Sequence, residues 1–200
     1  PAPLDIARRQ LEASVDWKYG GFGKAPKFPH PTNIERLLRH WAASDKSDSK
    51  ALEIACYCLR QMGLGGINDQ LGGGFCRYSV DEYWMIPHFE KMLYDNALLA
   101  ELYIKAAKIF NHKPYEQIAR ETLDFMLNEL MSGKDAMSAS LSAVDDKGIE
   151  GGFYLWDEET LKRVLTQQEY RLIRRVWGMQ HAPALEDGHH PVQAESLESA

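Results

Sequence analysis

The sequence predicts an all-α protein built from helical hairpins. Apolar residues recur at i, i+3, i+4 and i+7 through much of the chain, as in the stretch from Ile34 to Trp41. Two stretches match the capping box that begins many helices, Thr32–Glu35 and Thr166–Glu169. Strand and helix patterns do not alternate along the sequence, so we do not expect a Rossmann-type sheet.

About seven helices are expected, and short connections between them predict antiparallel neighbours. Their first residues lie near Leu4, Thr32, Ala51, Lys91, Pro114, Asp157 and Thr166. The stretch Lys91–Phe110 is apolar nearly all round, which is typical of a helix buried on most sides. Long polar loops separate the helix pairs, and loops of this kind are expected on one rim of an α/α toroid.

Residues 139–156 change period and predict a small β-hairpin. Leu141–Val144 and Gly152–Trp156 resemble two short strands on either side of a tight turn at Asp145–Gly148. No period survives beyond His181. The expected organisation is therefore a helical domain over residues 1–180, followed by a polar loop or poorly ordered tail over residues 181–200.

The overall charge argues against nucleic acid as the main partner. The 200 residues carry a formal net charge of −6, and phosphate-binding faces need a basic cluster. The nearest candidates, three arginines between residues 171 and 175, are interpreted as the solvated face of one helix. No apolar run approaches the roughly 20 residues that cross a bilayer, so no membrane partner is expected. Three cysteines without a Cys-x-x-Cys motif suggest reduced thiols and a cytoplasmic location.

The stretch Gly65–Asn96 concentrates glycine, charged and aromatic residues, which suits a shaped polar pocket better than a solvated linker. The alternative is a long ordered loop that seals helix ends by hydrogen bonds. We predict that the catalytic groups of this stretch converge on one concave surface. They are Asp69, Asp81, His88 and Glu90, joined by the cation Arg77.

Histidine is the usual proton-transfer residue near neutral pH, so His88 is the candidate base, with Asp69 or Glu90 as its partner acid. In a hydrolase, Asp69 and Asp81 are the candidate carboxylate pair. In the alternative interpretation, Arg77 pairs with Asp81 on the outside and His88 only caps its helix.

Aromatic rings beside charged groups suit a sugar-like ligand, because a ring covers the apolar side of a pyranose while charged groups take its hydroxyls. The candidate substrate-binding residues are Arg77, Tyr78, Trp84, Asp95 and Lys27. The zinc motif His-Glu-x-x-His is absent from the sequence, and neither a metal nor a cofactor is expected.

Several motifs together resemble the YyaL / spermatogenesis-associated protein 20 family. They are Gly20–Pro29, Asp69–Phe75, Arg77–Asp81, Pro87–Ala97 and Glu150–Trp156. The resemblance implies an N-terminal thioredoxin-like domain joined to an (α/α)-barrel similar to six-hairpin glycosidases and N-acylglucosamine 2-epimerases. It departs at residues 139–146, which only approximate the family's usual Asp-Ala-Asp pattern.

By this resemblance, the chain corresponds to the first half of a six-hairpin (α/α)6 toroid. The implied function is binding of a sugar-like molecule for epimerase, isomerase or glycosidase chemistry. The alternative is a non-catalytic helical module that docks to or regulates the thioredoxin-like domain. Half a ring exposes an apolar inner face, so self-association of the fragment is also expected.

Overall fold

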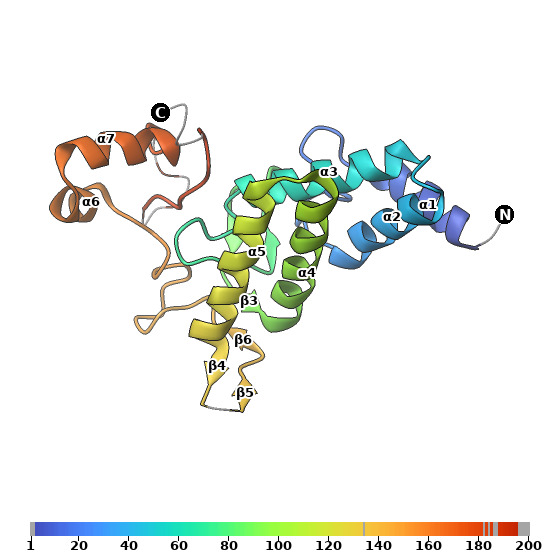
Figure 1. Cartoon of the computed structure of the whole chain (residues 1–200). Helices are drawn as coiled ribbons and strands as arrows, with labels where there is room; N and C mark the ends of the chain where they lie inside the picture. The colour runs from blue at the N-terminus through green and yellow to red at the C-terminus, as the bar shows by residue number, and fades with distance from the viewer. Residues whose placement is uncertain (1–2, 134, 182, 184, 186–187, 196–200) are drawn as a thin grey trace.

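The computed structural model describes residues 3–133, 135–181, 183, 185 and 188–195 (Figure 1). Seven α-helices lie within these residues, which confirms the prediction of a mostly helical protein. They are α1 (Pro3–Ser14), α2 (Pro31–Ala43), α3 (Ser49–Leu64), α4 (Leu93–Phe110), α5 (Lys113–Phe125), α6 (Glu158–Val164) and α7 (Gln167–Val176). None of the described helices is long and apolar enough to cross a membrane.

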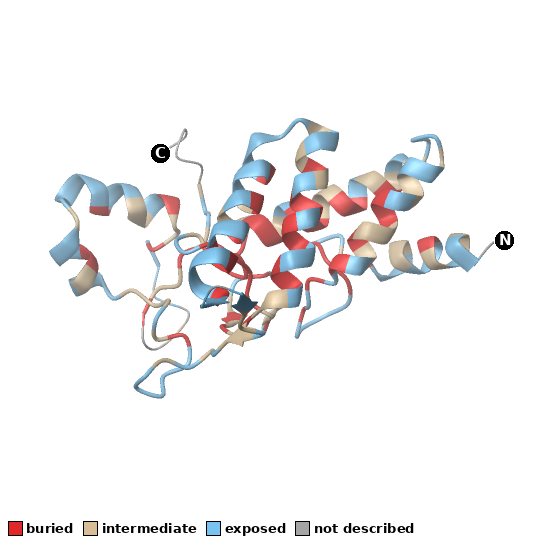
Figure 2. Ribbon diagram, turned by 60° about the horizontal axis from the view of Figure 1, so that its bottom comes forward, coloured by how far each residue is buried: buried red, intermediate tan, exposed pale blue. Residues whose placement is uncertain are grey.

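The main core lies among the first five helices. Helices α2 and α3 pack against each other, as do α4 and α5, and α2 also contacts α4. Buried residues gather on the facing sides of these helices (Figure 2). Ile34 and Leu37 of the predicted apolar stripe are fully buried, as are Leu59 and Tyr103 on the neighbouring helices. The spacing of apolar residues therefore gave a correct account of how these helices pack.

Capping was predicted correctly at one of the two sites. Thr166 accepts a hydrogen bond from the amide of Glu169, and the Glu169 carboxylate accepts one in return, so α7 begins with a capping box. The prediction at Thr32 was wrong, because α2 already begins at Pro31 and no side chain caps it. Glu35 is instead 2.9 Å from the ammonium group of Lys105.

Three two-stranded antiparallel pairs complete the described fold. They are β1 (Tyr78–Ser79) with β2 (Pro87–His88), β3 (Lys91–Met92) with β6 (Ser140–Leu141), and β4 (Met131–Ser132) with β5 (Ala136–Met137). A π-helical turn at Met126–Leu130 leads from α5 into β4. The β3–β6 pair joins segments far apart in the sequence, and the β1–β2 pair closes a loop. These two pairs position the candidate site.

The predicted β-hairpin at residues 141–156 is only partly present. Val144 and Glu150 form a single bridge around a turn, in which Asp145 accepts hydrogen bonds from the amides of Lys147 and Ile149. The second predicted strand, Gly152–Trp156, contains mostly turn residues. Only the start of the first predicted strand pairs elsewhere: Leu141 lies opposite Lys91, because the residues just before α4 are extended.

Helices α6 and α7 build a small core of their own around Leu161, Tyr170 and Met179. In Figure 1 they lie at the opposite end of the molecule from the N-terminus. Residues 188–195 tie this hairpin to the rest of the chain. His189 forms a bridge with Trp156, and the amide of Gln193 donates to the carbonyl of Leu64 in α3.

Candidate functional site

The β1–β2 pair brings together residues that are ten or more positions apart. Tyr78 lies opposite His88 in the antiparallel register, and the amide of Arg77 donates to the carbonyl of Glu90 at 2.8 Å. The side chains continue this pairing, since the Arg77 guanidinium lies 3.0 Å from the Glu90 carboxylate. Arg77 therefore pairs with Glu90, and the alternative pairing with Asp81 was wrong.

His88 is the centre of this group. Its Nδ1 lies 2.7 Å from Oε1 of Glu150, and its Nε2 lies 3.7 Å from Oε2 of Glu90. The ring stacks on Tyr78 with centroids 4.9 Å apart and planes inclined by 17°. The His88 side chain is 27% exposed, so it stays accessible to a ligand. A histidine flanked by two carboxylates and held by an aromatic ring has a fixed orientation, as proton transfer requires.

Asp95, in the first turn of α4, is electrostatically coupled to the same group. Burial raises the pKa of Asp95 to about 6, with Tyr94 and Arg77 acting in the opposite direction and Glu90 adding to the rise. The site thus holds a carboxylic acid that keeps its proton to a higher pH than an exposed aspartate. We name the set Arg77, Tyr78, His88, Glu90, Asp95 and Glu150 the His88 cluster.

Asp69 does not join this cluster. Side chains alternate between the two sides of an extended segment, and along residues 88–91 His88 and Glu90 are part-exposed while Phe89 and Lys91 are buried. Lys91 lies 2.7 Å from the Asp69 carboxylate, so Asp69 sits on the buried side. The convergence expected of all five residues therefore does not extend to Asp69.

The Asp69–Lys91 pair is built into the core. Lys91 also donates to the carbonyl of Gly73 at 2.8 Å, and Asp69 accepts from the amides of Leu71 and Gly72. Burial opposes ionisation of Asp69, but Lys91 and these amides outweigh it, so the pKa of Asp69 is lowered. All of these contacts serve the loop before β1, which makes Asp69 a structural anchor in this arrangement.

Asp81, Trp84 and Lys27 also lie apart from His88. Asp81 accepts from the amides of Tyr83, Met85 and Ile86, which organises the loop between β1 and β2. Trp84 is fully buried and donates from its indole nitrogen to the carbonyl of Tyr19, so its ring offers no exposed face for stacking. Lys27, predicted as a substrate-binding residue, is buried as well and pairs with Asp16.

Two residues that contact this region were not predicted as site residues from the sequence. Glu150 was named only within the motif Glu150–Trp156 of the family resemblance. His190, in the expected tail, is part-buried and packs against Phe89 with ring centroids 5.1 Å apart, and its Nε2 lies 2.5 Å from the carbonyl of Gly66. Burial lowers the pKa of His190, which favours the neutral ring. No local pattern could reveal either long-range contact.

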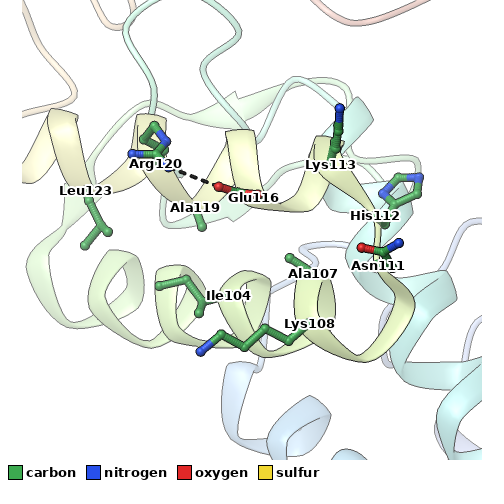
Figure 3. Close-up of a pocket in the computed structure, with 10 residues that line it drawn as sticks. All are labelled: Ile104, Ala107, Lys108, Asn111, His112, Lys113, Glu116, Ala119, Arg120 and Leu123. Carbon is green, nitrogen blue, oxygen red and sulfur yellow. Dashed lines mark hydrogen bonds and ion pairs between the residues drawn. The ribbon is translucent and has the colours of Figure 1, made fainter.

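A separate groove of about 450 Å³ lies between α4 and α5. Figure 3 shows Ile104 and Ala107 of α4 pointing toward Ala119 and Leu123 of α5, with an ion pair between Glu116 and Arg120 on the groove's edge. None of the predicted site residues lines it. Within the described ranges, no group of three or more His, Cys, Asp or Glu side chains is placed to hold a metal ion.

Comparison with known proteins places the chain in a family. No protein-family model matches it. It is 36% identical over 166 residues to spermatogenesis-associated protein 20 of Rattus norvegicus and 36% identical over 168 residues to the protein of that name in Homo sapiens. Each match covers 80% of this chain and 21% of the relative.

An uncharacterised protein of Caenorhabditis elegans is 34% identical over 166 residues, which cover 77% of this chain and 22% of that protein. The chain thus spans about a fifth of the length of these relatives. Over the matched region, the chain belongs to the spermatogenesis-associated protein 20 family.

Proposed function

We propose that the His88 cluster binds a sugar-like ligand and transfers a proton to or from one of its carbons, as an epimerase or isomerase does. The observation that carries this proposal is the contact between Nδ1 of His88 and Glu150, 62 positions apart in the sequence, at 2.7 Å. A carboxylate at one ring nitrogen fixes the tautomer and orientation of the imidazole, which leaves the other nitrogen to exchange a proton.

The neighbours of His88 supply the remaining functions. Arg77 spends one of its donors on Glu90, and a guanidinium has five, so others remain for hydroxyl or carbonyl oxygens of a ligand. Tyr78 and Phe28, with ring centroids 4.9 Å apart, form the aromatic surface beside His88. Asp95, with its raised pKa, is the group best suited to deliver a proton in weakly acidic solution.

The glycosidase version receives less support. It assigned the two reacting carboxylates to Asp69 and Asp81, and both are committed elsewhere, to Lys91 and to loop amides respectively. The (α/α)6 toroid remains part of the proposal, since six-hairpin architectures place long loops at a shared ligand-binding rim. A cytoplasmic location remains part of it as well. Burial raises the pKa of Cys58 to about 11, which suits an unreactive thiol in a reducing compartment.

The alternative function is a non-catalytic module that docks to a thioredoxin-like domain. The groove of Figure 3 favours it, because apolar side chains of α4 and α5 are accessible there and fit a protein surface. The two functions differ in what His88 does. Docking at the groove leaves His88 without a role, whereas proton transfer requires it.

Hydrogen–deuterium exchange into sugars separates these functions. The chain is incubated in D₂O with a panel of aldoses, ketoses and N-acylated amino sugars, and loss of the proton next to the carbonyl is followed by ¹H NMR. We expect exchange with at least one sugar, its loss in His88→Gln, and a reduced rate in Glu150→Gln. His112→Gln, at the far groove, is the matched control and should exchange normally. Absence of exchange throughout the panel, or its survival in His88→Gln, would refute the proposal.

A further inference from the structure

The hairpin of α6 and α7 holds a cavity of about 380 Å³ that the proposed function does not use. Half of its lining residues are cationic. The lining consists of Lys162, Leu165, Gln167, Tyr170, Arg171 and Arg174. The arginines of α7 were interpreted from the sequence as a solvated face, but the fold of the hairpin groups two of them with Lys162 of α6. A cavity with several cations and few acids selects for an anion.

Tyr170 forms the wall of this cavity and carries an unused hydroxyl. The residue is 8% exposed, and its buried hydroxyl has no hydrogen-bond partner among the described residues. Glu158 and Lys162 pair with each other and also interact with the Tyr170 side chain, and these contacts lower the pKa of Glu158 and raise that of Lys162. Neither of them meets the distance and angle of an ordinary hydrogen bond to the Tyr170 hydroxyl. A buried hydroxyl without a partner is costly, so its presence at a cavity wall points to a ligand that completes it.

The cations surround the same ring. Lys162 Nζ lies 5.3 Å and Arg174 Cζ 5.7 Å from the centroid of Tyr170. Lys162 is already paired with Glu158 at 2.7 Å. Among the described residues, Arg174 donates its Nε to the carbonyl of Met179 and makes no other hydrogen bond. Arg171 makes no ion pair within the described part of the chain. Two guanidinium groups thus keep donors in the fork arrangement that matches phosphate oxygens.

We propose that this cavity binds the phosphate group of a small phosphorylated ligand, held by Arg171 and Arg174 with the Tyr170 hydroxyl as an additional donor. A small ligand fits the cavity volume, whereas the formal net charge of −6 on the chain disfavours a long polyanion. This site involves no residue of the His88 cluster and stands independently of the proton-transfer proposal.

Titration with inorganic phosphate at constant ionic strength, followed by ³¹P NMR, tests the site. The unmodified chain should bind phosphate saturably at millimolar or lower concentration. Arg171→Gln should weaken binding by about tenfold, because it removes a charged donor pair. Tyr170→Phe should weaken binding by a few-fold and leave the melting temperature unchanged or higher, because the lost hydroxyl had no partner in the protein.

Arg163→Gln is the matched control, since it removes the same charge from an exposed residue of α6 outside the cavity lining. Its phosphate affinity should equal that of the unmodified chain. The proposal is overturned if the unmodified chain does not bind phosphate, or if Arg163→Gln weakens binding as much as Arg171→Gln. A lowered melting temperature in Tyr170→Phe would also overturn it, by showing that the hydroxyl already has a partner in the protein.

Discussion

The surroundings of Asp95 shift its pKa in opposite directions. Burial disfavours its charged form and raises its pKa to about 6, and Glu90 acts in the same direction, while Tyr94 and Arg77 favour ionisation. Between about pH 4 and pH 6, the folded chain therefore holds a proton that the unfolded chain releases. The free energy of unfolding contributed by Asp95 falls as the pH rises through this window.

Replacing Asp95 by Asn removes this pH dependence while preserving the shape of the side chain. We expect Asp95→Asn to match the unmodified chain in stability at pH 4 and to exceed it at pH 7.5 by on the order of 2 kcal/mol. Urea unfolding at the two pH values measures the difference. Asp146→Asn, at an exposed turn, should show the same stability difference at both pH values. A destabilised Asp95→Asn at pH 7.5 would contradict the assigned direction of the shift.

At the scale of single residues, sequence reasoning grouped Arg77, His88 and Glu90, which do lie close together, but it did not predict where their neighbours lie. It extended a helix back to Lys91, and helical spacing predicts that Lys91 pairs with Asp95. The segment is extended instead, so consecutive side chains lie on opposite sides and Lys91 is directed to Asp69. Glu150 reaches His88 through tertiary structure alone, and a single sequence holds no local signal for such a contact.

At the scale of elements, α2 and α7 show when a capping pattern is decisive. At Thr166 the residues before the helix are free to take the cap conformation, and both reciprocal hydrogen bonds form. At Thr32 the preceding Pro31 is itself compatible with the first helical turn, so the helix starts one residue earlier and Thr32 lies inside it. A local pattern thus predicts a helix better than it predicts the residue where the helix begins.

This difference gives a paired prediction. Thr166→Ala should lower stability by about 1 kcal/mol, because it leaves the amide of Glu169 without its partner. Thr32→Ala should change stability by less than about 0.5 kcal/mol, since Thr32 caps nothing. Urea unfolding measures both variants, and Thr166→Ser is the control that keeps the cap. Equal losses at the two threonines would show that α2 is capped by Thr32 after all.

At the scale of the whole molecule, the described chain has one large core around α1–α5, with a separate small cluster of Phe125, Met126 and Leu130 beside it, and a small core around α6 and α7. The apolar periodicity of the sequence was enough to predict the helices of both cores. Their relative arrangement depends on residues 188–195, where backbone pairing with Trp156 and Leu64 joins the two parts. That segment lacks any hydrophobic period, so its contribution to the fold was not predictable from its own sequence.

The groove between α4 and α5 carries the last prediction. Leu123, which lines the groove, is 40% exposed, and Leu127 nearby is 55% exposed. Ile104 faces Leu123 across the groove. Accessible apolar side chains of this kind favour association with another surface. In a symmetric pair of copies, the same patch meets itself and brings the lysines at the groove, Lys108 and Lys113, close to those of the partner copy. Added salt screens that repulsion, so association should strengthen as ionic strength rises.

Light scattering across a range of protein and salt concentrations measures this association. The average mass of the unmodified chain should rise with both, whereas Leu123→Lys should remain monomeric because it replaces an apolar contact by a further cation beside Lys108 and Lys113. Leu172→Lys, at an exposed position on α7, is the matched control and should associate like the unmodified chain. If the unmodified chain stays monomeric at every concentration, the exposed side chains of α4 and α5 do not drive self-association. The groove then remains available to a different partner, as the docking alternative requires.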